Sequence, residues 1–207
     1  MRTRSASPDL YRAMWYDKPA GDWKEALPLG NGRLGAMVFG GVNADQLLLN
    51  EKTVWTARPE AKDPADAAQR LDHMRRLLFQ EKYREAEECC QNEFMAAGWT
   101  SCYQPLGYLR MEFADRAEAS DYRRSLDIGQ AVATVLYAQS GGQHRREAFV
   151  SSADDVIVVR LSTDRPGGLC LDLALDRPAG FGGEAASHDT VRLVGEAAHG
   201  GEQKGVR

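Results

Sequence analysis

The sequence predicts a mainly β protein, an antiparallel β-sandwich that carries a helical insertion at about residues 63–97. Short apolar segments divided by turn residues recur along most of the chain, and a helical apolar period fills only one stretch. With few helices between the strands, antiparallel pairing is favoured over a parallel α/β sheet. The 207 residues, 43% hydrophobic and 27% charged, suffice for a single domain over residues 1–207 with a sizeable core.

The glycine-rich segment near the start predicts the first hairpin. Residues 34–42 are apolar, and Gly40-Gly41 marks a turn before a second strand at 46–50. Asn31-Gly32 predicts a tight turn just upstream. A phosphate-binding loop is the alternative, but neither a Lys-Ser/Thr pair nor a helix follows, so bending glycines in a strand are the better interpretation.

A stretch with a period of 3.6 residues begins at Asp63 and predicts the helical insertion. Asp63 and Pro64 have the character of an N-cap and a first helical residue, and Gly98 closes the stretch. Because the stretch exceeds the usual length of a helix, we expect one broken helix or two short ones.

After Gly98 the apolar period returns to two and predicts a series of strands. In Leu169–Asp176, alternate leucines predict one buried face and one face in water. Asp189–Val194 is a further strand candidate. The others are residues 108–113, 122–128, 131–138, 144–151 and 156–161.

The last residues, Gly195 to Arg207, are rich in Gly, Ala and Glu and contain one large aliphatic residue, Val206. Such a segment is not expected to supply a partner strand for an unfinished sheet. Either the domain closes without it or the sequence stops within the domain, and the second interpretation leaves a truncated gene product without independent activity as an alternative.

Charge and cysteine usage exclude several classes of partner. A formal net charge of -4 and a pI near 5.6 give no basic footprint, so neither nucleic acid nor a membrane surface is expected as a partner. The sequence shows no secretory signal and no run of the ~20 apolar residues that span a bilayer, which predicts a cytoplasmic location.

The potential metal ligands are too scattered for a metal site. Cys89, Cys90, Cys102 and Cys170 match neither zinc nor redox spacing, so free buried thiols are favoured. A bridge from Cys102 to one of the adjacent pair is the alternative. The histidines show no helical ligand spacing, which favours surface or locally hydrogen-bonded positions; no metal and no cofactor is expected.

Several blocks of the sequence resemble, in order and spacing, the N-terminal domain of glycoside hydrolase family 95, the α-L-fucosidase family. The resemblance covers the chain from about Trp15 to its last residues. Lys52 and Thr56-Ala57 are modest departures from that pattern. The blocks are residues 15–23, 25–41, 49–55, 103–107 and 122–127.

The resemblance implies a large β-sandwich, the N-terminal super-sandwich type, joined through helical linkers to a catalytic (α/α)6 barrel. It implies inverting hydrolysis of terminal α-L-fucosyl or α-L-galactosyl glycans by the full-length enzyme, with a Glu acid and an Asp base held downstream in the barrel. The chain alone is therefore expected to be a non-catalytic domain that packs against the absent barrel. A stand-alone carbohydrate-binding β-sandwich is the alternative.

Neither adjacent pair of acidic residues in the chain is expected to form a catalytic site. Inverting glycosidases need two carboxyl groups about 6.5–9.5 Å apart. If the segment is extended, Asp154 and Asp155 point to opposite faces. Glu87 and Glu88 lie in the predicted helical stretch and are expected to belong to its solvated face.

Aromatic residues could stack on sugar rings, although a structural role in a core or an interface is the default for Trp and Tyr. We assign no catalytic residue to this chain. The candidates for contact with substrate or with another domain are Asn31, Arg33, Asn50, Glu51 and Trp55.

Overall fold

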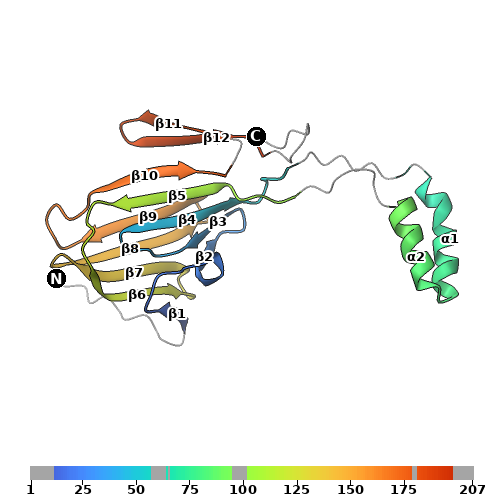
Figure 1. The fold of residues 1–207 in the computed structure, drawn as a ribbon, viewed down its shortest axis with the longest axis horizontal. Helices are drawn as coiled ribbons and strands as arrows, with labels where there is room; N and C mark the ends of the chain where they lie inside the picture. Colours follow the sequence, from blue (N-terminus) through green and yellow to red (C-terminus); the bar gives the residue numbers. More distant parts are fainter. Residues whose placement is uncertain (1–11, 57–63, 65, 95–101, 179–180, 198–207) are drawn as a thin grey trace.

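The computed structural model describes residues 12–56, 64, 66–94, 102–178 and 181–197. They form two five-stranded antiparallel sheets, a two-stranded hairpin and a helical pair. Figure 1 shows the two sheets layered on one another, with the helices set apart from them. The predicted antiparallel β-sandwich with a helical insertion is confirmed.

Sheet A has the strand order β1-β6-β7-β8-β9, and every pairing in it is antiparallel. Its inner face alternates regularly, as the period of two predicts: in β7 every second residue is buried. Its strands are β1 (Ala13–Tyr16), β6 (Ala119–Asp127), β7 (Val132–Gln139), β8 (Gly142–Ser151) and β9 (Val156–Thr163).

Sheet B has the strand order β10-β5-β4-β3-β2. The hairpin between β3 and β4 is the one that the glycine-rich segment predicts, and Gly40 has a φ of +77° in its turn. The strands are β2 (Leu27–Gly30), β3 (Leu34–Val38), β4 (Ala44–Glu51), β5 (Gly107–Phe113) and β10 (Leu171–Asp176).

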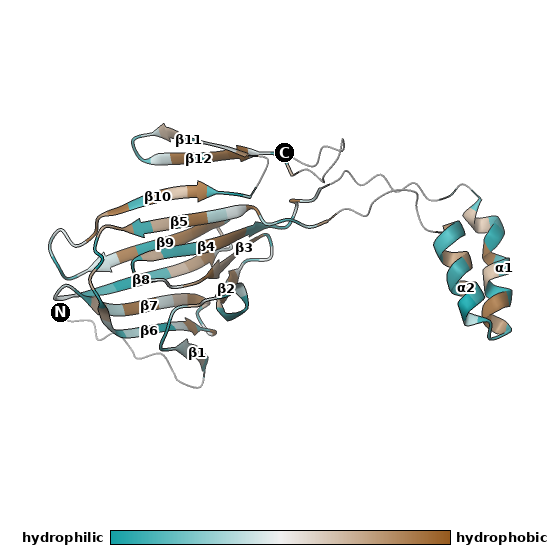
Figure 2. Cartoon of the chain, viewed as in Figure 1, coloured by the Kyte–Doolittle hydropathy of each residue, from teal (hydrophilic) through white to brown (hydrophobic). Residues whose placement is uncertain are grey.

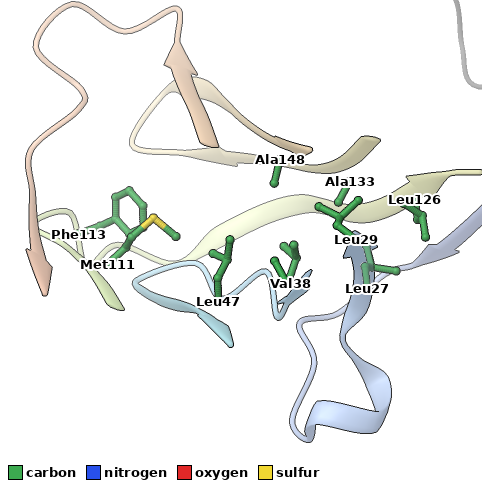
Figure 3. Packing of buried hydrophobic residues seen from close by; sticks show 10 residues of the cluster. Leu27, Leu29, Val38, Leu47, Met111, Phe113, Leu126, Ala133 and Ala148 are labelled. Carbon is green, nitrogen blue, oxygen red and sulfur yellow. The ribbon is translucent and has the colours of Figure 1, made fainter. Parts of the chain in front are cut away.

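The hydrophobic core lies between the two sheets (Figure 3). Both sheets contribute side chains that fill the gap, and removing a single large one, by a change from Leu to Ala, leaves a cavity that costs about 2–5 kcal/mol. The buried members are Leu27, Leu29, Ala36, Val38, Leu47, Met111, Phe113, Leu126, Ala133 and Ala148.

Part of the inter-sheet space is ionic. Asp45 of β4 and Arg146 of β8 form an ion pair at 2.7 Å, with side chains 2% and 5% exposed. Arg146 also donates to the Val42 carbonyl and to the Tyr137 hydroxyl, both at 2.8 Å, and its guanidinium lies over the Phe113 ring. The pair therefore joins the two sheets, and a buried charge of this kind is tolerated only with such partners.

A second buried guanidinium fixes the N-terminal segment. Arg124 of β6 donates to the Lys18 carbonyl at 2.8 Å and to the Glu25 carbonyl at 2.7 Å, and its guanidinium lies 4.1 Å from the centroid of the Tyr16 ring. These contacts give the block at 122–127 a structural role, because they hold the chain between β1 and β2 against sheet A.

The helical insertion consists of α1 (Ala67–Phe79), α2 (Tyr83–Cys89) and a short π-helix, η3 (Cys90–Phe94). The expected break is confirmed, and Glu81 has a φ of +60° at the turn between α1 and α2. The start of α1 was predicted too early: Asp66 precedes it, after a turn that Pro64 opens. Asp63 and Gly98 lie outside the described residues.

The C-terminal strands differ most from the prediction. The hairpin of β11 (Phe181–Ser187) and β12 (Thr190–Gly195) forms a sheet of its own beside β10. The strand at 171–176 is confirmed, but its predicted buried face is wrong: Leu173 is 53% exposed, and Leu169 is exposed too. The reason is position, because β10 is an edge strand of sheet B, and sheet A ends at β9.

Three strands lacked a sequence signal strong enough to predict them. Strand β1 and strand β2 are only four residues long, and β11 contains Gly-Gly and Ala-Ala in place of β-branched residues. A short 3-10 helix, η2 (Trp23–Glu25), lies between the first two. In the described part of the chain, no helix is long and apolar enough to cross a membrane.

Candidate functional site

The turn between β2 and β3 is built by the Asn31 side chain. Its Oδ1 accepts hydrogen bonds from the backbone N–H of Arg33 at 2.9 Å and of Leu34 at 2.8 Å. Gly32 has a φ of +91°, which a side chain rarely adopts, so the Asn-Gly pair suits this turn. The predicted tight turn is confirmed.

The same asparagine reaches the other sheet. Asn31 Nδ2 donates to the Ser151 carbonyl at 2.9 Å and to Asp155 Oδ1 at 3.0 Å. Ser151 is the last residue of β8, and Asp155 lies in the turn between β8 and β9 in sheet A. Asn31 therefore joins the turns of two sheets that are remote in sequence.

Arg33 lies between two carboxylates. Its Nε donates to Glu51 Oε1 at 3.1 Å, and its Nη1 donates to Asp155 Oδ2 at 2.5 Å. The Arg33 side chain is 58% exposed, whereas Glu51 is 12% exposed. We call Asn31, Arg33, Glu51 and Asp155 the Arg33 cluster; it brings together three of the five predicted contact residues.

Glu51 ends β4 and also caps the loop that follows. Its Oε2 accepts from the Thr53 N–H at 2.8 Å and from the Thr53 hydroxyl. These bonds to Thr53, together with the Arg33 guanidinium, hold the pKa of Glu51 below its ordinary value despite some opposing desolvation. Glu51 is therefore a fixed anion at neutral pH and not a proton donor.

Trp55 is presented by this loop beside Tyr103. The indole Nε1 donates to the Lys52 carbonyl at 2.9 Å, and the two ring centroids lie 5.5 Å apart at 64°. Trp55 is 41% exposed and Tyr103 is 45% exposed. The pKa of Tyr103 is raised, first by burial and then by the negative charge of Glu51, which places the Trp55–Tyr103 pair beside the Arg33 cluster.

Backbone pairing makes this aromatic pair rigid. Trp55 and Tyr103 form an isolated antiparallel bridge. Thr56 is fully buried; its N–H donates to the Cys102 carbonyl at 3.0 Å, and its hydroxyl accepts from the Cys102 N–H at 2.9 Å. The backbone bridge and the Thr56–Cys102 hydrogen bonds thus hold the two aromatic residues in place, which lowers the entropy cost of any contact that the rings make.

Asn50 does not join this group. It lies opposite Gly35 in the β3–β4 register, next to Glu51 along the strand. Because successive side chains of a strand point to opposite faces, Asn50 and Glu51 lie on different faces of sheet B. The structure therefore brings Asn31, Arg33, Glu51 and Trp55 to one end of the sandwich and leaves Asn50 on another face.

The adjacent acidic residues considered as catalytic pairs make local structural contacts. Asp154 and Asp155 lie in a turn and not on an extended strand, so the geometric premise for excluding them was wrong: Asp155 has a φ of +56°. Asp154 Oδ2 accepts from the Ser151 hydroxyl at 2.9 Å, whereas Asp155 belongs to the Arg33 cluster. Glu88 lies on α2 as expected, and it pairs with Arg84 at 3.2 Å on an exposed surface.

Several expectations about burial are corrected. Trp15, Trp23 and Trp55 are exposed and not core residues, and Trp99 lies outside the described residues. The four cysteines all lie in the described part of the chain and form no disulfide there, so the alternative Cys102 bridge is wrong. Only Cys89 is buried, whereas Cys102 and Cys170 are exposed.

The histidines also differ from the expectation in one case. His144 is buried, with its ring stacked on Tyr137 at 4.9 Å, whereas His73 and His188 are exposed. His199 lies outside the described residues. The spacing of alternate residues in β8 places His144 on the same inner face as Arg146, a signal that the sequence did contain.

Asp155 is the residue of this site that sequence reasoning missed. It was considered only as half of a catalytic pair, yet the polar run from Ser151 to Asp155 is a turn signal between two apolar strands. What the sequence does not contain is the register that brings this turn to Arg33, which arises from the packing of one sheet on the other.

The fold and this site define a class: a β-sandwich domain with a rigid polar and aromatic surface at one end. The chain belongs to the family described as glycosyl hydrolase family 65, N-terminal domain, whose model matches residues 14–207. It is an N-terminal domain of the glycoside hydrolase type.

Relatives of this chain are named as α-fucosidases. It is 35% identical over 161 residues to "Alpha-L-fucosidase 2" of Arabidopsis thaliana, covering 76% of this chain and 19% of that protein. It is 30% identical over 164 residues to "Probable alpha-fucosidase A" of Aspergillus niger, covering 74% and 20%, and 27% identical to the protein of that name from Aspergillus oryzae, covering 73% and 22%. The chain spans about a fifth of the length of these relatives.

Proposed function

We propose that this chain is the non-catalytic N-terminal domain of an inverting α-L-fucosidase-like glycoside hydrolase of family 95. In this proposal, terminal α-L-fucosyl or α-L-galactosyl groups are hydrolysed in a catalytic barrel outside residues 1–207. The sandwich supports that barrel through the end that carries the Arg33 cluster and the Trp55–Tyr103 pair. The similarity to proteins named as α-fucosidases supports the substrate class.

The observation that carries the proposal is the ionisation state of the site. Glu51 and Asp155 share one guanidinium, and the pKa of Glu51 is lowered. Glycoside hydrolysis by inversion needs one carboxylic acid that keeps its proton near neutral pH, with a pKa raised by its surroundings. Two carboxyl groups that are both bound by one guanidinium form a structural network and not an acid and base pair.

One carboxyl group of the described chain does have a raised pKa. Burial raises the pKa of Asp45 against the effect of Arg146. That side chain is 2% exposed and accepts from Arg146 at 2.7 Å and from the N–H groups of Gly41 and Gln46. A sugar has no access to it, so Asp45 does not provide the missing acid.

The exposed aromatic pair is the surface best suited to a second domain. Trp and Tyr are enriched among the residues that dominate protein interfaces. Here the Trp55 ring is oriented by its hydrogen bond to the Lys52 carbonyl, and the Tyr103 ring packs against it edge to face above their backbone bridge. Arg33 adds an exposed guanidinium to the same end. An exposed surface with aromatic and charged groups suits packing against a helical barrel.

A chimeric enzyme tests the proposal. The segment of the Arabidopsis α-L-fucosidase 2 that matches this chain is replaced by residues 14–207, and hydrolysis of an aryl α-L-fucoside is measured. We expect a folded, active chimera, and we expect Trp55→Ala to lower kcat or thermal stability of the chimera. Trp23→Ala, at an exposed residue of η2 that belongs neither to the Arg33 cluster nor to the aromatic pair, is expected to leave both unchanged.

Cooperative unfolding identifies chimeras that have folded. A folded chimera without activity contradicts the proposal that this domain supports the barrel. Equal behaviour of Trp55→Ala and Trp23→Ala contradicts the assignment of the contact surface.

A carbohydrate-binding module is the second candidate, because the Trp55–Tyr103 pair is exposed enough to stack on a pyranose face. Titration calorimetry of the chain with fucosylated oligosaccharides distinguishes the two. Saturable heat that Trp55→Ala abolishes favours the binding module, whereas no heat at millimolar ligand favours the domain-contact role.

A further inference from the structure

The β11–β12 hairpin is poorly covered by the rest of the described chain. All seven residues of β11 are exposed, and β12 pairs only with β11 among the described strands. A two-stranded hairpin is marginally stable at best in water. Each of its strands also presents backbone N–H and C=O groups along one edge, which is a template for another strand.

Apolar side chains gather around this hairpin. Figure 2 shows hydrophobic colouring on both β10 and β12, which lie beside each other. Leu173 of β10, Phe181 of β11, and Val191 and Val194 of β12 are all exposed. An apolar surface of this kind, rimmed by polar residues, is typical of an interaction site.

A cavity of about 580 Å³ lies at the end of the hairpin, next to the start of β5. Its volume falls within the range of about 300–1,000 Å³ that is usual for ligand sites. The described residues that line it are Leu106, Arg177, Phe181, Arg192, Leu193, Val194, Gly195 and Glu196.

Arg177 is the buried charge of this cavity. It is 9% exposed, and its Nη2 donates at 2.7 Å to the side-chain oxygen of Gln104, which is a neutral acceptor. A guanidinium has several further N–H donors, and burial of a cation is unfavourable unless acceptors are close. Arg192, which also lines the cavity, already forms an exposed ion pair with Glu184 at 3.5 Å. Glu196 lines the cavity too, and its carboxyl group disfavours a second anion near it. An added anion is therefore favoured only beside Arg177.

We propose that this cavity and the adjoining edge of β12 are the docking site of an extended polypeptide segment that carries an acidic side chain. The segment adds a strand to the hairpin, its apolar side chains cover Val194 and Leu193, and its carboxylate accepts hydrogen bonds from Arg177. This inference is independent of the proposed function, because it concerns another part of the sandwich and holds for any partner of this chemistry.

The backbone edge favours a polypeptide over a small carboxylate. Consecutive residues of β12, from Arg192 to Gly195, line the cavity, and strand addition uses the backbone of such an edge for affinity and pockets for specificity. A charge-assisted bond from a buried guanidinium adds to that affinity and selects an acidic side chain.

Solution NMR of the full chain tests the proposal with two tripeptides, acetyl-Val-Glu-Val-amide and acetyl-Val-Gln-Val-amide, and with hexanoate as a free carboxylate. We expect saturable shifts of the Arg177 Nε–H signal and of the Leu193 and Gly195 amides with the Glu peptide. The Gln peptide is expected to bind about tenfold more weakly, the loss typical of one charge-assisted hydrogen bond.

Variants complete the test. Arg177→Gln removes the preference for the Glu peptide, whereas Arg116→Gln, at the other end of β5, retains it; the spectra verify that both variants are folded. Equal binding of the two peptides, shifts confined to other parts of the chain, or a preference that survives Arg177→Gln overturns the proposal. Hexanoate that binds as tightly as the Glu peptide overturns the polypeptide assignment.

Discussion

Arg33 and Asp155 meet at 2.5 Å although they are 122 positions apart in the sequence. The contact joins the β2–β3 turn of sheet B to the β8–β9 turn of sheet A. It makes one end of the sandwich a single rigid unit, on which the loop of Trp55 rests through Glu51. Asp155 thus acts as a positioning residue for side chains that the sequence singles out as contact candidates.

Substitution of Asp155 tests this positioning role. Asn tolerates the positive φ of this position, so Asp155→Asn removes the charge and keeps the turn. We expect a loss of about 0.5–1 kcal/mol in the free energy of unfolding, the upper range for an exposed ion pair, and faster amide exchange at Leu34, whose N–H donates to Asn31. Asp154→Asn is the matched control, and an equal loss and equal exchange in both variants contradicts the role of Asp155.

Acid weakens the loop that carries Trp55. The pKa of Glu51 is lower in the folded chain than its ordinary value of 4.5, so its contribution to stability is present above that value and is lost as the pH falls below it. Urea titrations of the wild type and Glu51→Gln at a series of pH values are expected to differ at pH 7 and to converge in acid. A difference that stays constant down to low pH contradicts the assignment.

Removal of Arg146 leaves a buried carboxylate without its ion-pair partner. Asp45 loses its ion-pair partner in Arg146→Met, and the loss is expected to be about 3–5 kcal/mol in the free energy of unfolding. The double variant Asp45→Leu with Arg146→Met is expected to regain most of it, because an apolar pair replaces the ionic one. Arg145→Gln, on the outer face, is the control, and a double variant less stable than Arg146→Met contradicts this interpretation.

Much of the architecture was predictable from the sequence because the apolar periods of strands and helices, two and 3.6 residues, are local patterns. The strands from residue 107 to 163 and the broken helix follow from side-chain spacing and turn residues alone. The exposure of the leucines in β10 was not predictable, because the same alternation of leucines is compatible with an inner strand or an edge strand. Only the assembled order of the sheets places β10 at an edge.

In the candidate site, too, the features that depend on local sequence were predictable and those that depend on sheet packing were not. Asn31-Gly32 was predictable as a turn because the Asx geometry is local. The meeting of Arg33 with Asp155 and the exposure of Trp55 depend on how one sheet packs on the other, which no local pattern contains. Asn50 was grouped with Glu51 from adjacency in sequence, although adjacent residues of a strand face apart.

Two glycines of the β2–β4 region have different requirements. A Cβ at Gly41 would lie 1.9 Å from the Ala44 carbonyl oxygen, whereas a Cβ at Gly32 would meet nothing within 4 Å. Gly32→Ala is therefore expected to cost only the positive φ, about 1–2 kcal/mol, and Gly41→Ala to cost more. Thermal unfolding of both variants checks the order, and a Gly41→Ala protein as stable as Gly32→Ala contradicts it.

The exposed Leu173 side chain is expected to promote self-association. It is 53% exposed on β10, although the β11–β12 hairpin lies beside that strand, and exposed apolar side chains favour association with other chains. Size-exclusion chromatography is expected to show oligomers that Leu173→Lys reduces without loss of the free energy of unfolding. A wild type that remains monomeric at high concentration contradicts this expectation.

Catalysis outside this chain is the central claim, and a turnover assay of the purified 207-residue protein on an aryl α-L-fucoside tests it most directly, with the Arabidopsis relative as the active reference. The account predicts a rate equal to that of buffer from pH 4 to pH 8, because the pKa of Glu51 is lowered, Asp155 is bound by Arg33, and Asp45 is buried. Clear turnover that persists through purification and disappears in Glu51→Gln would contradict it.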